Sequence, residues 1–520
     1  MPITHLGLNL RQLHSPLPMF HGSVDREQWA AAARSIGQAR GRLLALWGSD
    51  RGEGADGAMV VCAAYVIERG LLWLELPLTT PATGYPDLAS GFPCAERMQR
   101  ALADMHGVQA QNPLDVRPWL DHGLWPRDFR PLAYAARESA ALAITSPAPY
   151  PFVRVEGDGV HEIAVGPVHA GIIEPGHFRF SVVGEKVLRL EERLGYVHKG
   201  IERRFTELSP HDAFRLAGRV SGDSTVAYAW AYCMALESAA GVTIPLRAAW
   251  LRALLLERER VANHLGDLGA LGNDAGLAVG LAQFSRLRED WQRLSRMLFG
   301  HRLLMDCVLP GGVAVDIDAA AVQQIAAQCD AIETEVRAMH SLYDEHAGLQ
   351  DRLIGTGRVT PELAAQLGLS GLAGRASGQA LDQRSQFPSV PYDAMDVRIA
   401  THHNGDVAAR VSLRFDEVLE SLRLIRCIVN ELPAGAIHVD IDLPQRATFG
   451  AGWVEGWRGE ILVALELVPH DGGVRIRRCH CHDPSWQNWP VIEHAMIGNI
   501  VPDFPLINKS FNLSYSGHDL

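Results

Sequence analysis

The sequence predicts an α+β protein in which a helical-bundle core with β subdomains follows a small α+β domain. Long segments after Glu185 carry apolar residues every three or four positions, which is the period of an amphipathic helix. Short apolar runs that alternate or are broken by Gly occur before Glu185 and after residue 434, and these are typical of strands. A chain of 520 residues also exceeds the length over which one core keeps growing, so we expect two or more domains.

The first predicted domain covers residues 1–148. Residues 59–66 and 71–78 are apolar, strand-like runs, and residues 95–106 are predicted to form a helix. The prolines at positions 147, 149 and 151 favour an extended linker, because proline fixes φ and cannot continue a helix. We therefore assign residues 149–520 to a second domain.

The second domain begins and ends with strand-like sequence. Residues 152–155, 162–165 and 178–182 are short alternating segments, and alternation returns over residues 434–482. A helix is predicted near residues 489–497, and the stretch after it is predicted to be loop-like.

Between these strand-like regions, three apolar stripes predict three long helices that pack as a bundle. Pro245 precedes the first of them and suits the first turn of a helix. The stripes are Leu254, Val261, Leu265 and Leu268; Val322, Ile325, Cys329, Ile332, Val336 and Met339; and Val407, Val411, Phe415, Val418, Leu422, Ile425 and Val429.

Composition and missing motifs exclude several classes of function. The formal net charge of −12 argues against a nucleic-acid partner, because phosphate contacts need an excess of Lys and Arg. We find no signal-like start and no run of eighteen apolar residues, so we expect no membrane span in the chain itself. The eight cysteines are too sparse for a disulfide framework, and phosphate-loop and dinucleotide motifs are absent, so direct ATP or NAD binding is not expected.

Residues 479–482 look like a metal site, but we interpret them as structural residues. Cys479, His480, Cys481 and His482 are consecutive, and on a strand their side chains point alternately to opposite faces. They therefore do not converge on one ion.

A glycine-punctuated loop, residues 166–179, is a better candidate for a site, because it carries His169 and Glu174 and ends in a strand. Residues 193–203, with the sequence RLGYVHKGIER, follow it. Together these two segments resemble the start of the large subunit of group-4 nickel–iron hydrogenases, of the hydrogenase-4 and formate hydrogenlyase type. They also resemble the related quinone-site subunit of complex I.

The resemblance extends over residues 160–520, through ordered blocks at 219–224, 256–264, 374–378, 455–459 and 488–490. Residues 95–98 and 125–132 resemble the partner module that is fused in front of the large subunit in this subfamily. The resemblance implies that residues 1–148 are that partner module and that the complex is a membrane-associated oxidoreductase.

The departures from the family pattern decide what we expect of the site. In the hydrogenases, two Cys-x-x-Cys pairs supply four thiolates to nickel and iron. Here these positions fall on Ser221 and Ser224, and on Ser514 and Gly517. Neutral hydroxyls and a glycine do not replace thiolates around a soft metal, so we expect no metal and no hydrogenase activity.

The resemblance also points to side chains that could still act. Glu174 matches the glutamate that passes protons away from the metal, and Arg458 matches the arginine above the open coordination site. A plainer interpretation is that Arg458 pairs with Glu455 or Asp223, because a buried guanidinium needs a carboxylate. Glu174, His169 and Arg458 are our candidate catalytic residues, and the candidate cavity is lined by Ser221, Asp223, Ser224 and Ser514.

A quinone site is weakened but stays open. His169 matches the first quinone-binding histidine of the complex I relatives, whereas a second histidine and a tyrosine are replaced by Ile173 and Gly222. Neither replacement can donate a hydrogen bond or a proton to a quinone. A different pose that uses His169 or Tyr228 would be needed.

Three functions follow from the resemblance. The first is a metal-free, hydrogenase-related large subunit of a membrane-bound, energy-converting oxidoreductase complex, acting in electron transfer and redox-to-ion coupling. The alternatives are an NADH dehydrogenase (quinone)-like subunit with a remodelled quinone site, and a non-catalytic scaffold; whether the chain is an enzyme by itself stays open. The expected partners are an iron–sulfur small subunit that carries the cluster, a ferredoxin-like subunit and membrane antiporter-like subunits, with this chain peripheral on the cytoplasmic side.

Overall fold

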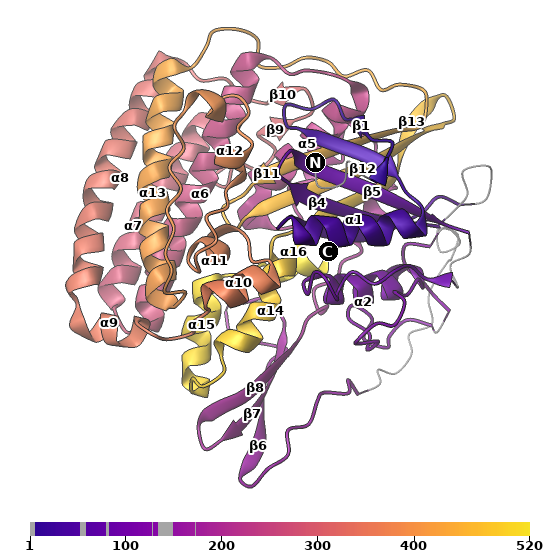
Figure 1. The fold of residues 1–520 in the computed structure, drawn as a ribbon. Coiled ribbons are helices and arrows are strands. Elements are labelled where there is room, and N and C mark those ends of the chain that lie inside the picture. Colours follow the sequence, from indigo (N-terminus) through magenta and orange to yellow (C-terminus); the bar gives the residue numbers. More distant parts are fainter. Residues whose placement is uncertain (1–5, 53–58, 80–82, 127, 134–148, 172) are drawn as a thin grey trace.

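The computed structural model describes residues 6–52, 59–79, 83–126, 128–133, 149–171 and 173–520, and its fold is α+β, as predicted (Figure 1). A five-stranded sheet forms the N-terminal part in the order β1-β2-β5-β4-β3, with β2 parallel to β5 and the other pairs antiparallel. The strands are β1 Arg11–Gln12, β2 Met19–Ser23, β3 Arg42–Asp50, β4 Met59–Ile67 and β5 Gly70–Leu78, and the helices are α1 Arg26–Gln38 and α2 Ala95–His106.

The sequence located the main elements of this part correctly. The predicted helix at residues 95–106 is α2, and the two predicted strands are β4 and β5. Both strands are buried along nearly their whole length, which explains why their sequences are continuous apolar runs. Part of the predicted proline-rich linker lies outside the described residues.

A small antiparallel sheet projects from the body of the molecule (Figure 1), in the order β6 Val160–Val165, β7 His177–Val183 and β8 Lys186–Arg193. The strand predicted at residues 152–155 is wrong, because this segment is held by side chains instead of a ladder. The Phe152 ring lies 4.8 Å from the Tyr150 ring, and Val153 N donates to the Glu191 carboxylate at 2.9 Å.

Four long helices form the predicted bundle on one side of the molecule (Figure 1): α6 Leu246–Asp274, α7 Ala278–Phe299, α8 Ala319–Glu345 and α13 Val407–Glu431. The three apolar stripes lie on α6, α8 and α13 and are buried apart from the partly exposed Val322, which confirms the helical prediction.

Helix α5 Thr225–Ala240 is buried and links the bundle to a second antiparallel sheet. This sheet consists of β11 Thr448–Glu455, β12 Glu460–His470 and β13 Gly473–His482. Glycines let β11 approach α5 closely, because a Cβ at Gly452 would lie 1.8 Å from Ala231 O. The predicted alternation is therefore correct for residues 448–482. It is wrong for residues 434–447, where His438 forms a single bridge to Gly312 and Asp440 points into solvent.

The end of the chain is helical, which corrects the prediction of a loop. The helix expected at residues 489–497 is α14 Ser485–Ala495, which starts earlier and contains Pro490, and α15 Phe504–Phe511 and α16 Tyr515–Asp519 follow it. Helices of eight and five residues are too short to show a clear apolar period. The segment nevertheless buries Phe504, Ile507 and Phe511 and carries Ser514 into the core.

The remaining elements are short. They are α3 Ile201–Phe205, α4 Phe214–Ala217, β9 Val308–Leu309, β10 Gly312–Val313, α9 Ala347–Leu353, α10 Pro361–Leu367, α11 Gly371–Arg375, α12 Gln383–Gln386, and 3-10 turns at Gly222–Ser224, Tyr392–Ala394 and Val501–Asp503. One apolar core runs through both parts of the chain. None of the described helices combines the length and apolar character needed to cross a bilayer.

Candidate functional site

Two segments that are nearly 300 residues apart in sequence meet at a buried centre within residues 149–520. Ser221 precedes the 3-10 turn Gly222–Ser224 that leads into α5, and Ser514 caps the N-terminus of α16. The Ser221 and Ser514 hydroxyl oxygens lie 2.9 Å apart, and Ser514 Oγ also accepts from Gly517 N at 2.8 Å. The tertiary structure thus brings together the positions that the family pattern singled out.

An ion pair closes one side of this centre. Arg458 donates to both carboxylate oxygens of Asp223, at 2.5 and 2.9 Å, and Ser221 Oγ donates to the same carboxylate at 2.7 Å. Burial alone raises the pKa of Asp223, but the charge and hydrogen bonds of Arg458 outweigh this effect and hold the pKa below its usual value. The Asp223 side chain is still 35% exposed, so the pair is reached from the surface of this chain.

The guanidinium of Arg458 is held in place from three further directions. Its centre lies 4.0 Å from the Trp457 ring, its Nε donates to Asn512 O at 2.5 Å, and an Nη lies 3.4 Å from Ser224 Oγ. A bidentate, stacked arginine of this kind is a fixed positive charge.

Of the two carboxylates that could have paired with Arg458, the structure selects Asp223. Glu455 faces another buried cation and accepts from Arg375 at 2.9 Å. Arg375 also donates to Glu417 at 2.8 Å, so Glu455 belongs to the network that joins β11 to α13.

Asp483 occupies the space beside Gly517, the fourth position at which the resemblance implies a cysteine in the hydrogenases. A Cβ on Gly517 would lie 2.4 Å from Asp483 Oδ2, so no side chain fits at residue 517 while the carboxylate stays there. Asp483 is held by the Tyr228 hydroxyl, which donates to it at 2.7 Å, and by Ser485 N at 2.8 Å. The sequence analysis did not identify Asp483. Its position directly after the polar strand segment 479–482 was the signal that could have pointed to a buried carboxylate.

These residues do not fit a nickel–iron centre. The centre contains three hydroxyls and a glycine where four thiolates would be required, and the hydroxyls are hydrogen-bonded to one another and to Asp223 and Arg458. Carboxylate and hydroxyl oxygens are hard ligands, whereas a nickel–iron centre requires soft thiolates.

The loop with the other candidates reaches the same region. Glu174 accepts from Ser516 N at 3.0 Å, which ties the loop to α16 two residues beyond Ser514. His169 Nε2 lies 2.8 Å from Gly176 O, within its own loop. Tyr228, the tyrosine candidate for quinone binding, donates to Asp483. His169 and Tyr228 therefore both already have hydrogen-bond partners. Ile173 is 51% exposed.

The segment 479–482 lies on β13 as predicted, and its histidines have separate partners. His480 Nδ1 lies 2.7 Å from Glu202 Oε1, and its ring stacks on Trp47 at 4.6 Å. His482 Nε2 lies 2.9 Å from Gln487 Oε1. Burial lowers the pKa of His482 to about 3, so it is neutral and acts in packing and hydrogen bonding.

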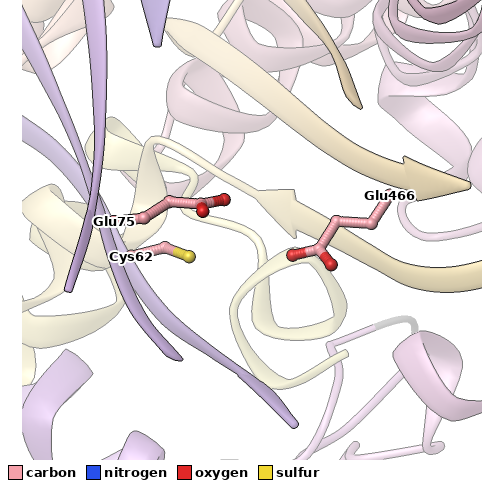
Figure 2. Close-up of side chains that lie close together, drawn as sticks. All are labelled: Cys62, Glu75 and Glu466. Atoms are coloured by element: carbon pink, nitrogen blue, oxygen red, sulfur yellow. The ribbon is translucent and has the colours of Figure 1, made fainter. Parts of the chain in front are cut away.

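Figure 2 shows the one group of side chains within the described ranges that could share a metal ion: Cys62, Glu75 and Glu466. Arg51 donates to Glu75 at 2.7 Å and to Glu466 at 3.2 Å, and Arg477 donates to Glu466 at 2.9 Å. Two guanidinium groups thus balance the two carboxylates. The group is best explained as a contact that joins β5 of the first sheet to β12 of the second.

A helical bundle beside a buried centre, at which an early loop and the C-terminal segment meet, places the chain in the class of hydrogenase and complex I large subunits. Residues 274–451 match the family described as respiratory-chain NADH dehydrogenase, 49 kDa subunit. Formate hydrogenlyase subunit 5 of Escherichia coli (strain K12) is 30% identical over 495 residues, which cover 92% of this chain and 85% of that protein.

Two further similarities agree. A carbon monoxide-induced hydrogenase of Rhodospirillum rubrum is 32% identical over 353 residues, covering 68% of this chain and 97% of that protein. The structure of the membrane-bound sulfane sulfur reductase, an archaeal respiratory membrane complex, contains a chain that is 25% identical with a TM-score of 0.64, covering 70% of this chain and 99% of that one. The protein described here belongs to this family of hydrogenase-related large subunits, as the sequence predicted.

Proposed function

We propose that this chain is the large subunit of a membrane-bound, energy-converting oxidoreductase complex and works there without a nickel–iron centre, in electron transfer and redox-to-ion coupling. The observation that supports the proposal is the buried hydroxyl pair of Ser221 and Ser514, at two positions where the resemblance implies thiolate ligands, beside the bidentate Arg458–Asp223 pair. The similar sulfane sulfur reductase complex supports the idea that the fold also serves reactions without hydrogen.

Each candidate side chain would have a separate role. Glu174 would carry protons at the edge of the centre, Arg458 would supply a fixed positive charge, and His169 would shape the loop. The iron–sulfur cluster would be on a small subunit, with ferredoxin-like and membrane antiporter-like subunits completing a complex on the cytoplasmic side. Within the chain, residues 1–148 would be the partner module and residues 149–520 the large-subunit domain.

Metal content and hydrogen chemistry test this proposal on the native complex. We expect the purified complex to contain iron but far less than one nickel per copy of this chain, and to evolve no hydrogen from reduced methyl viologen. Formate hydrogenlyase prepared in parallel is the positive control. Stoichiometric nickel or hydrogen evolution would overturn the proposal.

A remodelled quinone site is the alternative that the 49 kDa family match supports. A photoaffinity quinone that labels the loop around His169 in the complex would favour it. Substitution of Glu174, His169 and Arg458, one at a time, separates both ideas from a scaffold role. Unchanged ion coupling in all three assembled variants would support the scaffold.

A further inference from the structure

A groove of about 390 Å³ lies between the N-terminal part and the second domain. Helix α2, the loop around Trp119, strand β8 and helix α14 form its walls. Arg97 on α2 and Arg117 in the loop face Glu191 and Glu192 on β8 and Glu493 on α14. The groove is thus lined by charged side chains from segments that are far apart in the sequence.

Glu192 is the unusual group in this groove. It is 1% exposed, its Oε1 accepts from Arg97, and its Oε2 has no hydrogen-bond partner among the residues that the structure describes. Arg97 also donates to Glu493 at 2.9 Å, and Glu493 accepts from Glu192 N at 2.9 Å. One guanidinium therefore serves two carboxylates, and a proton on Glu192 would make the three groups electrically neutral.

The pKa of Glu192 fits this geometry. Burial raises it to about 8, against the lowering effect of Arg97 and together with the raising effect of Glu493. The neighbouring Glu191 is different, because both of its oxygens have partners: Arg117 at 2.5 Å and Val153 N at 2.9 Å.

Helix α14 links Glu192 to the centre of the second domain. Trp489 and Glu493 are four residues apart and lie on the same face of α14. Glu493 binds Glu192 N, whereas the Trp489 ring lies 4.7 Å from the Tyr515 ring. Tyr515 also packs directly on Gly176, two residues after Glu174, and its hydroxyl oxygen accepts from Asn508 Nδ2 at 3.3 Å. Burial raises the pKa of this hydroxyl, and Glu192 and Glu174 add smaller contributions in the same direction.

We propose that Glu192 is a proton-exchanging carboxyl group that takes protons from water in this groove and passes them, through the Tyr515 hydroxyl, toward Glu174. A proton from groove water, which the buffer replaces, binds to the free Oε2. The Glu192 carboxyl group then gives one proton to the Tyr515 hydroxyl oxygen, and this hydroxyl releases its own proton toward Glu174. Only O–H bonds form and break, and nothing is oxidised or reduced in the relay. Transfer of the proton toward Glu174 rests on the proposed function above, whereas proton exchange between Glu192 and water does not.

The first test is infrared spectroscopy of the purified full-length chain between pH 6 and 10. We expect a protonated-carboxyl band that titrates near pH 8 and is lost in Glu192→Gln. Glu191→Gln, the matched control on the same strand, should keep the band. Buried Glu259 and Glu455 also have raised pKa values, so the assignment depends on the difference between the two variants. No difference between Glu192→Gln and the unmodified chain would overturn the proposal.

The second test measures proton uptake by the whole complex in liposomes when it is reduced with titanium(III) citrate. We expect Glu192→Gln and Tyr515→Phe to slow uptake by about a hundredfold, the scale of a lost proton-transfer group, and Glu191→Gln to leave it unchanged. Uptake at the normal rate in Glu192→Gln would refute the relay. If the unmodified complex takes up no protons, the relay and the coupling function both fail, while the infrared difference still decides whether Glu192 exchanges protons.

Discussion

Replacement of Gly517 by alanine tests the packing of the centre with a single added carbon. The new Cβ would lie 2.4 Å from Asp483 Oδ2 and 2.7 Å from its Cγ, whereas ordinary contacts begin at 3.4 Å. Asp483 is 1% exposed and is held by Tyr228 and Ser485, so it cannot yield without breaking hydrogen bonds.

The size of the effect follows from two costs. Overpacking of a tight site costs about 1–3 kcal/mol, and a buried Tyr228 hydroxyl that loses its acceptor adds about 1–3 kcal/mol. We expect Gly517→Ala to lower the free energy of unfolding by about 2–6 kcal/mol and Tm by roughly 2–6 °C, because an unfolding entropy of about 1.1 kcal/mol/K for a chain of this length converts 1 kcal/mol into about 1 °C. Differential scanning calorimetry of the full-length chain measures this shift.

Two comparisons make the result specific. Gly91→Ala is the control, because its Cβ would meet nothing closer than 3.9 Å, and its Tm should stay within about 1 °C. Asp483→Ala in the Gly517→Ala background should relieve the clash, so that the double variant is less destabilised than the sum of the single variants. A normal Tm for Gly517→Ala, or strict additivity, would refute the reasoning.

Two more predictions concern buried ion pairs on and beside the sheet β11–β13. Arg478 and His480 overcome the effect of burial and lower the pKa of Glu202 to about 2, so its stabilising effect is present above pH 4.5 and is lost as the pH falls toward 2. Glu202→Gln should therefore weaken the fold at pH 7 by up to about 3 kcal/mol and make the urea midpoint less sensitive to acid, and an unchanged acid profile would contradict this. Arg51→Met leaves Glu75 and Glu466 with fewer partners and should cost about 2–4 kcal/mol in thermal unfolding, whereas the exposed control Arg286→Met should cost less than about 1 kcal/mol. Equal losses for the two arginine variants would argue against the contact in Figure 2.

The sequence by itself determined the fold class, the long helices and the family. The stripes on α8 and α13 are long enough for the helical period to be unambiguous, and the ordered blocks around residues 193–203 and 455–459 carry the resemblance. It also showed that cysteine is absent at Ser221, Ser224, Ser514 and Gly517, because the identity of a residue is a property of each position alone. The short helices α15 and α16 were missed for the opposite reason, since so few residues show no clear period.

Only the tertiary structure decided how the polar groups pair. The sequence left both Glu455 and Asp223 as possible partners of Arg458. In the fold, Glu455 at the end of β11 pairs with Arg375, and Asp223 pairs with Arg458. The packing of Asp483 beside Gly517 and the position of Glu192 between Arg97 and Glu493 likewise involve partners 34 to 301 residues apart. A pKa or a hydrogen bond depends on which groups lie within a few ångströms, and chain folding, rather than local periodicity, brings such distant groups together.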